Sequence, residues 1–220
     1  PPLNEKFLQI LRSRKKIIMF FLDTVTIPKI ENATLIITKK KAYLHQLNDE
    51  NTSIIEHKIQ IVHSDSKKDE EIAVIIDEFI IDCLDIYYSV KIDSQNITFD
   101  DKVVYEYEQG TITELETRKE SLVFSMSIPE KIILEDEIQV KISVSNDGYF
   151  IIDDDCGKII KIKILNFFKK NKFNFLKFNS SFLKDFFNEN PKKFCKVFTS
   201  DEFPLCFETF DKRTFISPII

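Results

Sequence analysis

Three consecutive aspartates, Asp153 to Asp155, are the densest group of possible metal ligands in the sequence. Clustered carboxylates can bind hard cations such as Mg²⁺ or Ca²⁺. A similar polar cluster stands at 48–51, where the residues are Asn, Asp, Glu and Asn. Asn and Asp in such clusters favour tight turns, because their side chains bond to the nearby backbone. We therefore expect hairpin turns at both places and no metal site.

The cysteines and histidines do not form a readable catalytic or zinc-binding set. No CxxC pair is present, and the histidines lack metal-ligand spacing with any cysteine. We expect free, buried thiols in a reducing compartment. The chain has only 3 glycines, which excludes the glycine-rich phosphate loops of nucleotide-binding enzymes. The sequence thus predicts neither catalysis nor a bound cofactor. The residues concerned are Cys83, Cys156, Cys195, Cys206, His45, His57 and His63.

A basic cluster is the clearest candidate for ligand contact. Arg12, Arg14, Lys15 and Lys16 stand where apolar spacing predicts a helix over 14–26. Positive charge at a helix N-terminus opposes the helix dipole, at about 0.3–1 kcal/mol per charge. Such a cost suggests another use, and phosphate contact is our hypothesis, with an ordinary solvated basic face as the alternative. The formal net charge is −5, so DNA contact would require basic residues concentrated on one surface.

The pattern of apolar residues predicts a chain rich in strands with a few short helices. In the first half it predicts helices over 14–26 and 72–84, and strands at 7–11, 33–38, 41–47, 53–62, 86–92, 96–99 and 102–108. In the second half it predicts a helix over 180–188, and strands at 122–128, 138–144, 148–152, 158–165, 193–199, 204–210 and 213–217. No apolar run approaches the 18 or so residues that a membrane span needs.

The two halves repeat the same order of elements at an offset near 105 residues. The segment 54–59 corresponds to 159–164, the turn at 48–51 to that at 153–156, and the helical segment 75–84 to 180–189. Such a repeat indicates duplication of one structural unit. Only about ten residues, 129–138, stand where the first half has a predicted helix, so that helix is short or missing in the second half.

Four segments, in this order within the duplication, carry a family resemblance. Leu44–Asp49 resembles the clamp segment L-Q-S-M-D-S, and Leu183–Phe187 resembles Y-L-N-F-F. Phe203–Glu208 resembles a strand of the form V-P-L-V-V-E, and Phe215–Ile220 resembles the ending Y-L-A-P-K-I. The chain therefore resembles the eukaryotic DNA sliding clamps, namely PCNA and the related heterotrimeric checkpoint clamp.

The resemblance implies an α+β fold of the duplicated DNA-clamp (processivity) type, with two β-rich domains and helices on one face. The domains would be 1–105 and 121–220, joined by a connector at 106–120. It also implies a trimeric ring in the nucleus that encircles duplex DNA without sequence preference. Its partners would be like or related clamp subunits, a clamp loader, and polymerase and other peptide-motif clients. No membrane, metal or cofactor is implied.

Three surfaces follow from the resemblance. The DNA-facing lumen would use Arg12, Arg14, Lys15, Lys16 and Lys184, with Lys192 and Lys193 as secondary candidates. The subunit interface would pair strands near 103–108 and 158–164, through Val104, Glu106, Glu108, Lys161, Ile162 and Lys163. The pocket for partner peptides would comprise Leu47, Thr52, Pro204, Ser217, Pro218, Ile219 and Ile220. Alternatively, the strands could be protected within one monomer and the C-terminus could simply pack on the core.

Other functions remain open at this point. The shortened segment 129–138 and the short connector depart from PCNA and leave room for a divergent checkpoint-clamp subunit. Asp77, Glu78 and Asp82 also stand where a clamp would carry lysine, so we expect no DNA contact from that helix. A β-rich interaction domain without a DNA role is the alternative from another class, and an enzyme is the least supported.

Overall fold

The structure is a computed structural model, and it describes residues 19–38, 40–65, 70–113, 115–117, 121–201 and 204–219. The chain divides into two compact units, of which the first comprises 1–46 and 57–113 and the second 47–56 and 114–220. The second unit therefore includes Leu47–Glu56, a segment that the sequence-based division places in the N-terminal domain. The predicted basic cluster at 12–16, the predicted strand at 7–11, and Ile220 lie outside the described residues.

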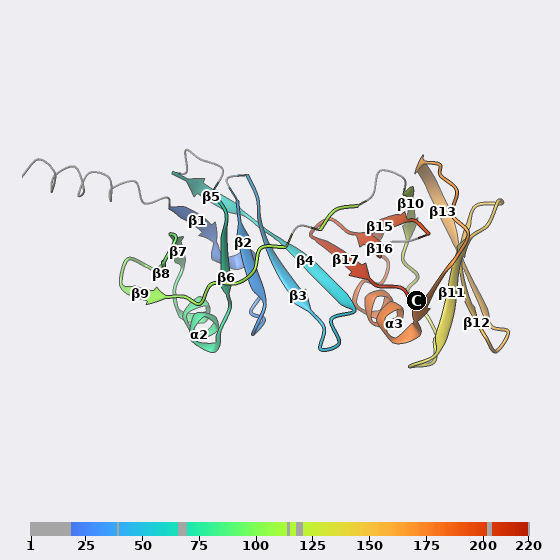
Figure 1. Cartoon of the computed structure of the whole chain (residues 1–220), viewed down its shortest axis with the longest axis horizontal. Coiled ribbons are helices and arrows are strands. Elements are labelled where there is room, and N and C mark those ends of the chain that lie inside the picture. Colours follow the sequence, from blue (N-terminus) through green and yellow to red (C-terminus); the bar gives the residue numbers. More distant parts are fainter. Residues whose placement is uncertain are drawn as a thin grey trace, which may run out of the picture. The chain divides into compact units, whose positions relative to one another are not determined.

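In its described residues, the first unit contains strands of two sheets and the α-helix α2 (Figure 1). One sheet has the strand order β5-β1-β7-β8-β9, and the other contains β3-β2-β6. The elements are β1 (Phe20–Asp23), the 3₁₀ turn η1 (Thr24–Thr26), β2 (Thr34–Ile37), β3 (Ala42–Leu47), β5 (Ile61–Ser64), β6 (Ile72–Ile75), α2 (Glu78–Ile86), β7 (Ser89–Ile92), β8 (Asn96–Phe99) and β9 (Val103–Glu106).

The second unit repeats this plan. Its strand order is β14-β11-β12-β13-β10-β15-β16-β17, followed by the first part of β4 (Ser53–Ile59), a strand whose last three residues belong to the first unit. The elements are β10 (Leu122–Ser127), β11 (Gln139–Val144), β12 (Tyr149–Asp154), β13 (Ile159–Lys169), β14 (Leu176–Asn179), α3 (Ser180–Glu189), β15 (Phe194–Thr199), β16 (Leu205–Glu208) and β17 (Lys212–Ile216).

The predicted duplication is visible in the strand order. In the first unit β5-β1-β7-β8-β9 are neighbours, and in the second β13-β10-β15-β16-β17 follow the same order. The helix follows the corresponding strand in each case, β6 before α2 and β14 before α3. In the first unit β4 and β5 are separate strands, whereas the single long strand β13 pairs with both β12 and β10.

The predicted helix over 14–26 is wrong for the residues that the structure describes. Phe20–Asp23 is strand β1, which pairs with β5 on one side and β7 on the other. Phe20 and Leu22 are buried while Phe21 is partly exposed, so buried residues recur at every second position, as in a strand. Only η1 and a loop separate β1 from β2. The described connection from β1 to β2 therefore contains no α-helix. The segment 129–138 of the second half contains none either, where a short or missing helix was predicted.

The predicted helix over 72–84 begins too early. Ile72–Ile75 is strand β6, paired with β2, and Asp77 caps the helix α2 that follows by accepting a bond from the Ile80 amide. An extended N-cap ends the strand and begins the helix within three residues. The helix predicted over 180–188 is α3, although its cap is Asn179 and neither of the two serines that follow.

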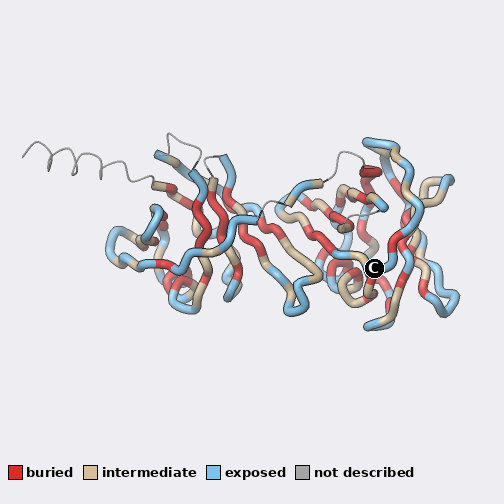
Figure 2. Tube along the Cα trace, viewed as in Figure 1, coloured by how far each residue is buried: buried red, intermediate tan, exposed pale blue. Residues whose placement is uncertain are grey.

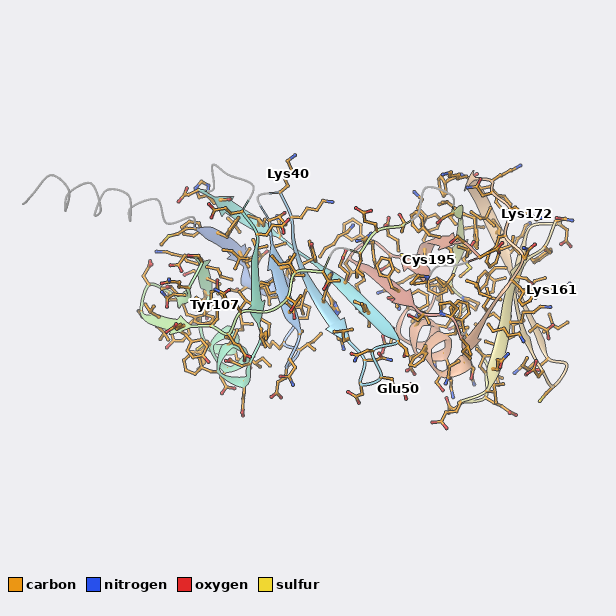
Figure 3. All side chains as sticks on the ribbon, viewed as in Figure 1. Lys40, Glu50, Tyr107, Lys161, Lys172 and Cys195 are labelled. Atoms are coloured by element: carbon orange, nitrogen blue, oxygen red, sulfur yellow. The ribbon has the colours of Figure 1, made fainter. Side chains whose placement is uncertain are left out.

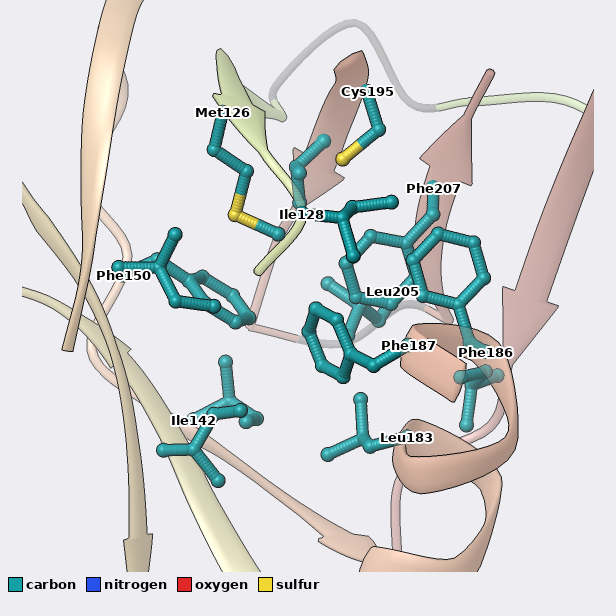
Figure 4. Packing of buried hydrophobic residues seen from close by; sticks show 14 of the residues in the cluster. Met126, Ile128, Ile142, Phe150, Leu183, Phe186, Phe187, Cys195, Leu205 and Phe207 are labelled. Carbon is teal, nitrogen blue, oxygen red and sulfur yellow. The ribbon is translucent and has the colours of Figure 1, made fainter. Parts of the chain in front are cut away.

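Each unit has its own hydrophobic core, as the buried segments in Figure 2 show. In the second unit α3 contributes Leu183, Phe186 and Phe187 to the core (Figure 4). Phe186 stacks on Phe207 of β16, with ring centroids 4.2 Å apart. Burial of each such ring stabilises the unit by about 1.5–3 kcal/mol. The core-facing side of these sheets thus points toward α3.

Candidate functional site

A cavity of about 190 Å³ lies in the second unit between the connector and the outward face of the sheet. The connector supplies Leu115–Thr117 to its wall. The sheet supplies Phe198, Cys206 and Phe215 from three neighbouring strands, since Phe198 pairs with Cys206 and Cys206 with Phe215. The floor is therefore apolar and rigid. The remaining lining residues are Asn51, Thr52, Ile54, Ser121, Pro204 and Ser217.

The connector is attached to the sheet by Arg213. Its guanidinium donates to the Glu56 carboxylate at 2.7 Å and to the Leu115 carbonyl at 2.9 Å. The Glu56 side chain is only 9% exposed and that of Arg213 22% exposed, so water screens this ion pair weakly. The planar guanidinium can bond a carboxylate and a carbonyl at once, which fixes Leu115 over the cavity.

Burial determines the reactivity of Cys206, the thiol among the residues that line this cavity. Cys206 is 1% exposed, and burial raises the pKa of its thiol well above the usual range. The thiolate is the reactive form of cysteine, so this side chain is an apolar part of the cavity floor. Among the described residues, no group of His, Cys, Asp and Glu is arranged to hold a metal ion. The Asp153–Asp155 segment ends β12 as a hairpin, where Asp154 accepts bonds from the Cys156 and Lys158 amides.

The predicted peptide pocket is only partly assembled as expected. Thr52, Pro204 and Ser217 line the cavity. Leu47 is 53% exposed, and it is not among the lining residues. The C-terminal segment is held beside the cavity, because Ser217 donates to the Thr52 carbonyl and Ile219 to the Lys177 carbonyl. The Ile219 and Pro218 side chains are likewise outside the lining.

Sequence reasoning missed most of the apolar lining. Leu115, Phe198, Cys206 and Phe215 were not predicted. Phe198 follows the period-two alternation of β15, so its side chain lies on the face of the sheet opposite to that of the core residue Val197. Alternation alone would have put Phe198 on an outward face. The position of the connector above it depends on the Arg213 bond to the Leu115 carbonyl, which no sequence pattern indicates.

The first predicted interface strand, β9, lies at the edge of its sheet. Among the described strands it pairs with β8 alone, through Thr98↔Val104 and Asn96↔Glu106. Val104 is 66% exposed, and Glu106 and Glu108 are also exposed. The other face of β9 is anchored, because the Tyr105 hydroxyl donates to Asp77, the cap of α2. An edge strand with free backbone groups can accept a further strand.

The second predicted interface strand is the first half of β13. Residues 159–163 pair with β12, whereas β10 pairs only with the second half, from Ile164 onward. The Ile164 amide donates to the Gly148 carbonyl, and the Asp154 amide donates to the Lys158 carbonyl. The backbone groups of the even-numbered residues in this part of β13 therefore point toward β12. Strand alternation then directs the amides of Lys161 and Lys163 to the side without a described partner strand. The Ile162 side chain is buried in the core and does not contribute surface.

The exposed helix surfaces in the described part of the chain are mainly acidic. On α2 the exposed charged residues are Glu78, Asp82 and Asp85, and Asp85 pairs with Lys29. On α3 the predicted DNA contact Lys184 forms an ion pair with Asp136 at 3.0 Å, while Asp185 and Glu189 are exposed. Of the secondary candidates, Lys192 pairs with Glu130, and Lys193 donates to Asn190.

Comparison with solved structures identifies the fold. PCNA of A. fulgidus, solved with the C-terminal region of FEN-1 bound, is 16% identical with a TM-score of 0.57, covering 93% of this chain and 99% of that chain. Proliferating Cellular Nuclear Antigen of Entamoeba histolytica is 10% identical with a TM-score of 0.56, covering 93% and 99%. This chain has the PCNA-type sliding-clamp fold. The PCNA2-PCNA3 complex of Sulfolobus tokodaii gives 12% identity and a TM-score of 0.54, covering 91% and 98%.

The predicted fold class, a duplicated clamp fold with two β-rich domains, is confirmed by these full-length similarities. No family model and no curated protein matches the chain. At this level of identity the PCNA-type clamps establish the fold alone. Within the described part of this clamp fold, no helix is long and apolar enough to cross a membrane.

Proposed function

We propose that the chain is a subunit of a ring-forming sliding clamp, which encircles duplex DNA and tethers replication or repair proteins. It acts without chemistry of its own, in the nucleus, and a clamp loader opens the ring. The two edge strands carry the proposal. A ring requires two different, complementary edges on each subunit, and the unpaired sides of β9 and of the first half of β13 support such a pairing.

The charges on these edges support head-to-tail pairing. β9 ends with Glu106, Glu108 lies two residues further on, and β13 carries Lys161 and Lys163; all four are exposed. If β9 of one copy adds to β13 of the next, opposite charges face each other across the new strand pair. Each such pair contributes about 0.2–1 kcal/mol, and the backbone bonds of strand addition contribute the rest.

Client peptides would bind in the cavity beneath the connector. Its floor of Phe198, Cys206 and Phe215 fits apolar anchor residues, and its rim offers hydroxyl groups for the peptide backbone. PCNA of A. fulgidus was solved with the C-terminal region of FEN-1, which makes a peptide ligand a reasonable expectation for the same fold.

A subunit of a mixed ring, such as the checkpoint clamp, is a second candidate. The acidic helix surface favours it. Glu78, Asp82 and Asp85 on α2 would repel phosphates, so related subunits would have to supply positive charge to the lumen. Light scattering distinguishes the two arrangements, because a homotrimer forms from this chain alone whereas a mixed ring requires related subunits.

A charge-swap experiment tests the edge pairing. Lys161→Glu with Lys163→Glu should weaken assembly, and so should Glu106→Lys with Glu108→Lys. Combining all four changes should restore assembly in a homotrimer, measured by light scattering over a concentration series. In a mixed ring the same variants are tested with the related subunit. A wild-type chain that stays monomeric alone and with all related subunits would refute the ring and favour a β-rich interaction domain.

Retention on closed circular DNA tests encirclement. Arg12, Arg14, Lys15 and Lys16 lie outside the described residues, and their role in the lumen stays a prediction. Changing Lys15 and Lys16 to glutamate should reduce retention most at low salt, because screening is weak there. Lys184→Glu serves as the comparison, since that lysine is already paired with Asp136. Equal retention of the Lys15 and Lys16 variant and the wild type would remove these two residues from the lumen.

A further inference from the structure

A strongly basic segment belongs to the sheet of the second unit. Residues 158–177 contain seven lysines and no aspartate or glutamate, although the net charge of the chain is −5. The segment forms β13, the loop after it, and β14. Figure 3 shows Lys161 and Lys172 extending from the sheet side of the unit, away from α3. The proposed ring uses only the edge of β13, so most of this charge has no role yet.

Strand register gathers four lysines on one outward face of β14-β11-β12-β13. Lys177 lies directly opposite Lys141 on the neighbouring strand. Lys161 and Lys163 stand opposite Ile151 and Tyr149 on β12. All four lysines are exposed, whereas the alternate residues of these strands enter the core. We call this surface the lysine face.

Few acids neutralise the lysine face. Asp153 lies opposite Lys141, and Asp147 is in the turn between β11 and β12. Among the described residues, none of the four lysines forms an ion pair. Like charges directly opposite each other, as at Lys141 and Lys177, are unfavourable in a sheet. An anionic partner would remove that repulsion.

Aromatic rings accompany the lysines on this face. The Lys141 amino group lies 5.1 Å from the centre of the Phe175 ring, and the Lys161 amino group 5.8 Å from that of Tyr149. Phe175 is 47% exposed, just before β14. Lysines interleaved with exposed rings are typical of sheets that bind single-stranded nucleic acid, because phosphates meet the lysines and bases stack on the rings. An acidic peptide would use the lysines alone.

We propose that the lysine face binds single-stranded nucleic acid, with Lys141 and Lys177 contacting phosphates and Phe175 providing a stacking surface. This site is separate from the lumen, since it lies on the sheet face opposite α3. It is also compatible with ring assembly. Lys141 is on β11, which is separated from β13 by β12. Lys177 is on β14, which lies one strand further away, beyond β11.

Fluorescence anisotropy of the full chain with labelled dT20 tests the proposal. Lys141→Glu with Lys177→Glu should lower the affinity at least about tenfold at low salt. Replacement of both by glutamine should reduce the slope of log K against log salt by about 1.4, because each lost contact to a single strand removes about 0.7. Phe175→Ala should lower affinity several-fold without changing that slope.

Matched controls separate this site from general charge effects. Lys40→Glu with Lys102→Glu makes the same change in net charge at exposed lysines of the first unit, and Phe194→Ala removes an exposed ring from β15. Both should leave binding within about twofold of wild type. Circular dichroism and light scattering verify that fold and assembly are unchanged in all variants, so failure of the ring would be seen separately.

Three results would overturn the proposal. The first is equal loss of binding in the control charge variant, which would indicate a diffuse electrostatic effect. The second is unchanged affinity after Phe175→Ala together with equal affinity for duplex, which would remove the stacking role. The third is binding of a polyglutamate peptide through the same lysines without binding of dT20, which would assign the face to an acidic protein.

Discussion

Replacing Arg213 should loosen the connector and destabilise the second unit. Arg213→Met keeps an unbranched, largely apolar side chain, but removes the ion pair with Glu56, the bond to the Leu115 carbonyl and the contact of the guanidinium with the Phe215 ring. Removing one member of a buried ion pair costs about 3–5 kcal/mol. The Arg213 side chain is 22% exposed, so water can partly solvate Glu56. We therefore expect a loss of about 2–3 kcal/mol in the free energy of unfolding.

Urea denaturation followed by circular dichroism measures that loss, and proteolysis reports on the connector. Loss of one hydrogen bond, worth about 1 kcal/mol, should raise the population of detached connector about fivefold. Chymotryptic cleavage after Leu115 should accelerate to the same degree. The double variant Arg213→Met with Glu56→Gln carries no uncompensated carboxylate, so it should be more stable than the sum of the single changes predicts.

The reasoning would be refuted if Arg213→Met changed neither stability nor the cleavage rate at Leu115. Strict additivity of the two substitutions would refute the ion pair specifically, since residues that interact show a coupling energy. Lys196→Met is a suitable control, because it removes a cation from the same sheet face, where Lys196 lies over Phe168 and Phe198. It should leave cleavage at Leu115 unchanged.

Three further predictions concern thiols, pH and the start of the connector. Burial raises the pKa of Cys195 to about 12 and, helped by the charges of Asp82 and Asp77, raises the pKa of Cys83, whereas Cys156 is exposed; a thiol reagent at pH 8 should therefore modify one thiol per native chain and four in urea, and rapid modification of Cys206 would contradict the enclosed cavity floor. Burial likewise raises the pKa of Tyr107 from 10.0 to about 12. Because the folded state binds this proton more tightly, its contribution to stability is complete below pH 10 and should disappear as the pH rises to 12. Tyr107→Phe should abolish this pH dependence in an alkaline series of melting temperatures. A Cβ added at Gly110 would lie 2.8 Å from Cγ2 of Thr34; Gly110→Ala should cost the first unit about 1–3 kcal/mol in chemical denaturation, and Thr34→Ser, which removes that methyl group, should recover part of the loss.

Much of the fold could be predicted because period-two alternation is a local signal. The duplication and the helix α3 follow from apolar spacing and from the order of the elements, whereas the edge position of β9 was expected from the family resemblance. The helix over 14–26 was mistaken because Phe20, Phe21 and Leu22 fit either period in so short an apolar run. The pairing of β1 with β5 and β7 on its two sides decides the outcome, and that is a tertiary effect.

The candidate site was less predictable because its parts are distant in the sequence. Thr52, Pro204 and Ser217 could be proposed from the family resemblance. Arg213 and Glu56 could not, because they are 157 positions apart in the sequence and form a pair only once the chain has folded. The lysine face needed strand register in the same way. Alternation shows that Lys141 and Lys177 point outward, but only pairing of β11 with β14 places them opposite each other.

The shared strand β4 has a consequence for how the molecule folds. Its first residues belong to the second unit, where β4 is the neighbour of β17, a strand that comes much later in the sequence. During synthesis, Leu47–Glu56 must therefore wait until β17 has been made before its sheet is complete. Contacts of such long sequence separation slow folding, because loop closure precedes any gain in contact energy. A nascent chain released before β17 would expose an unpaired strand, so premature termination should lead to chaperone capture or aggregation rather than to an independent first unit.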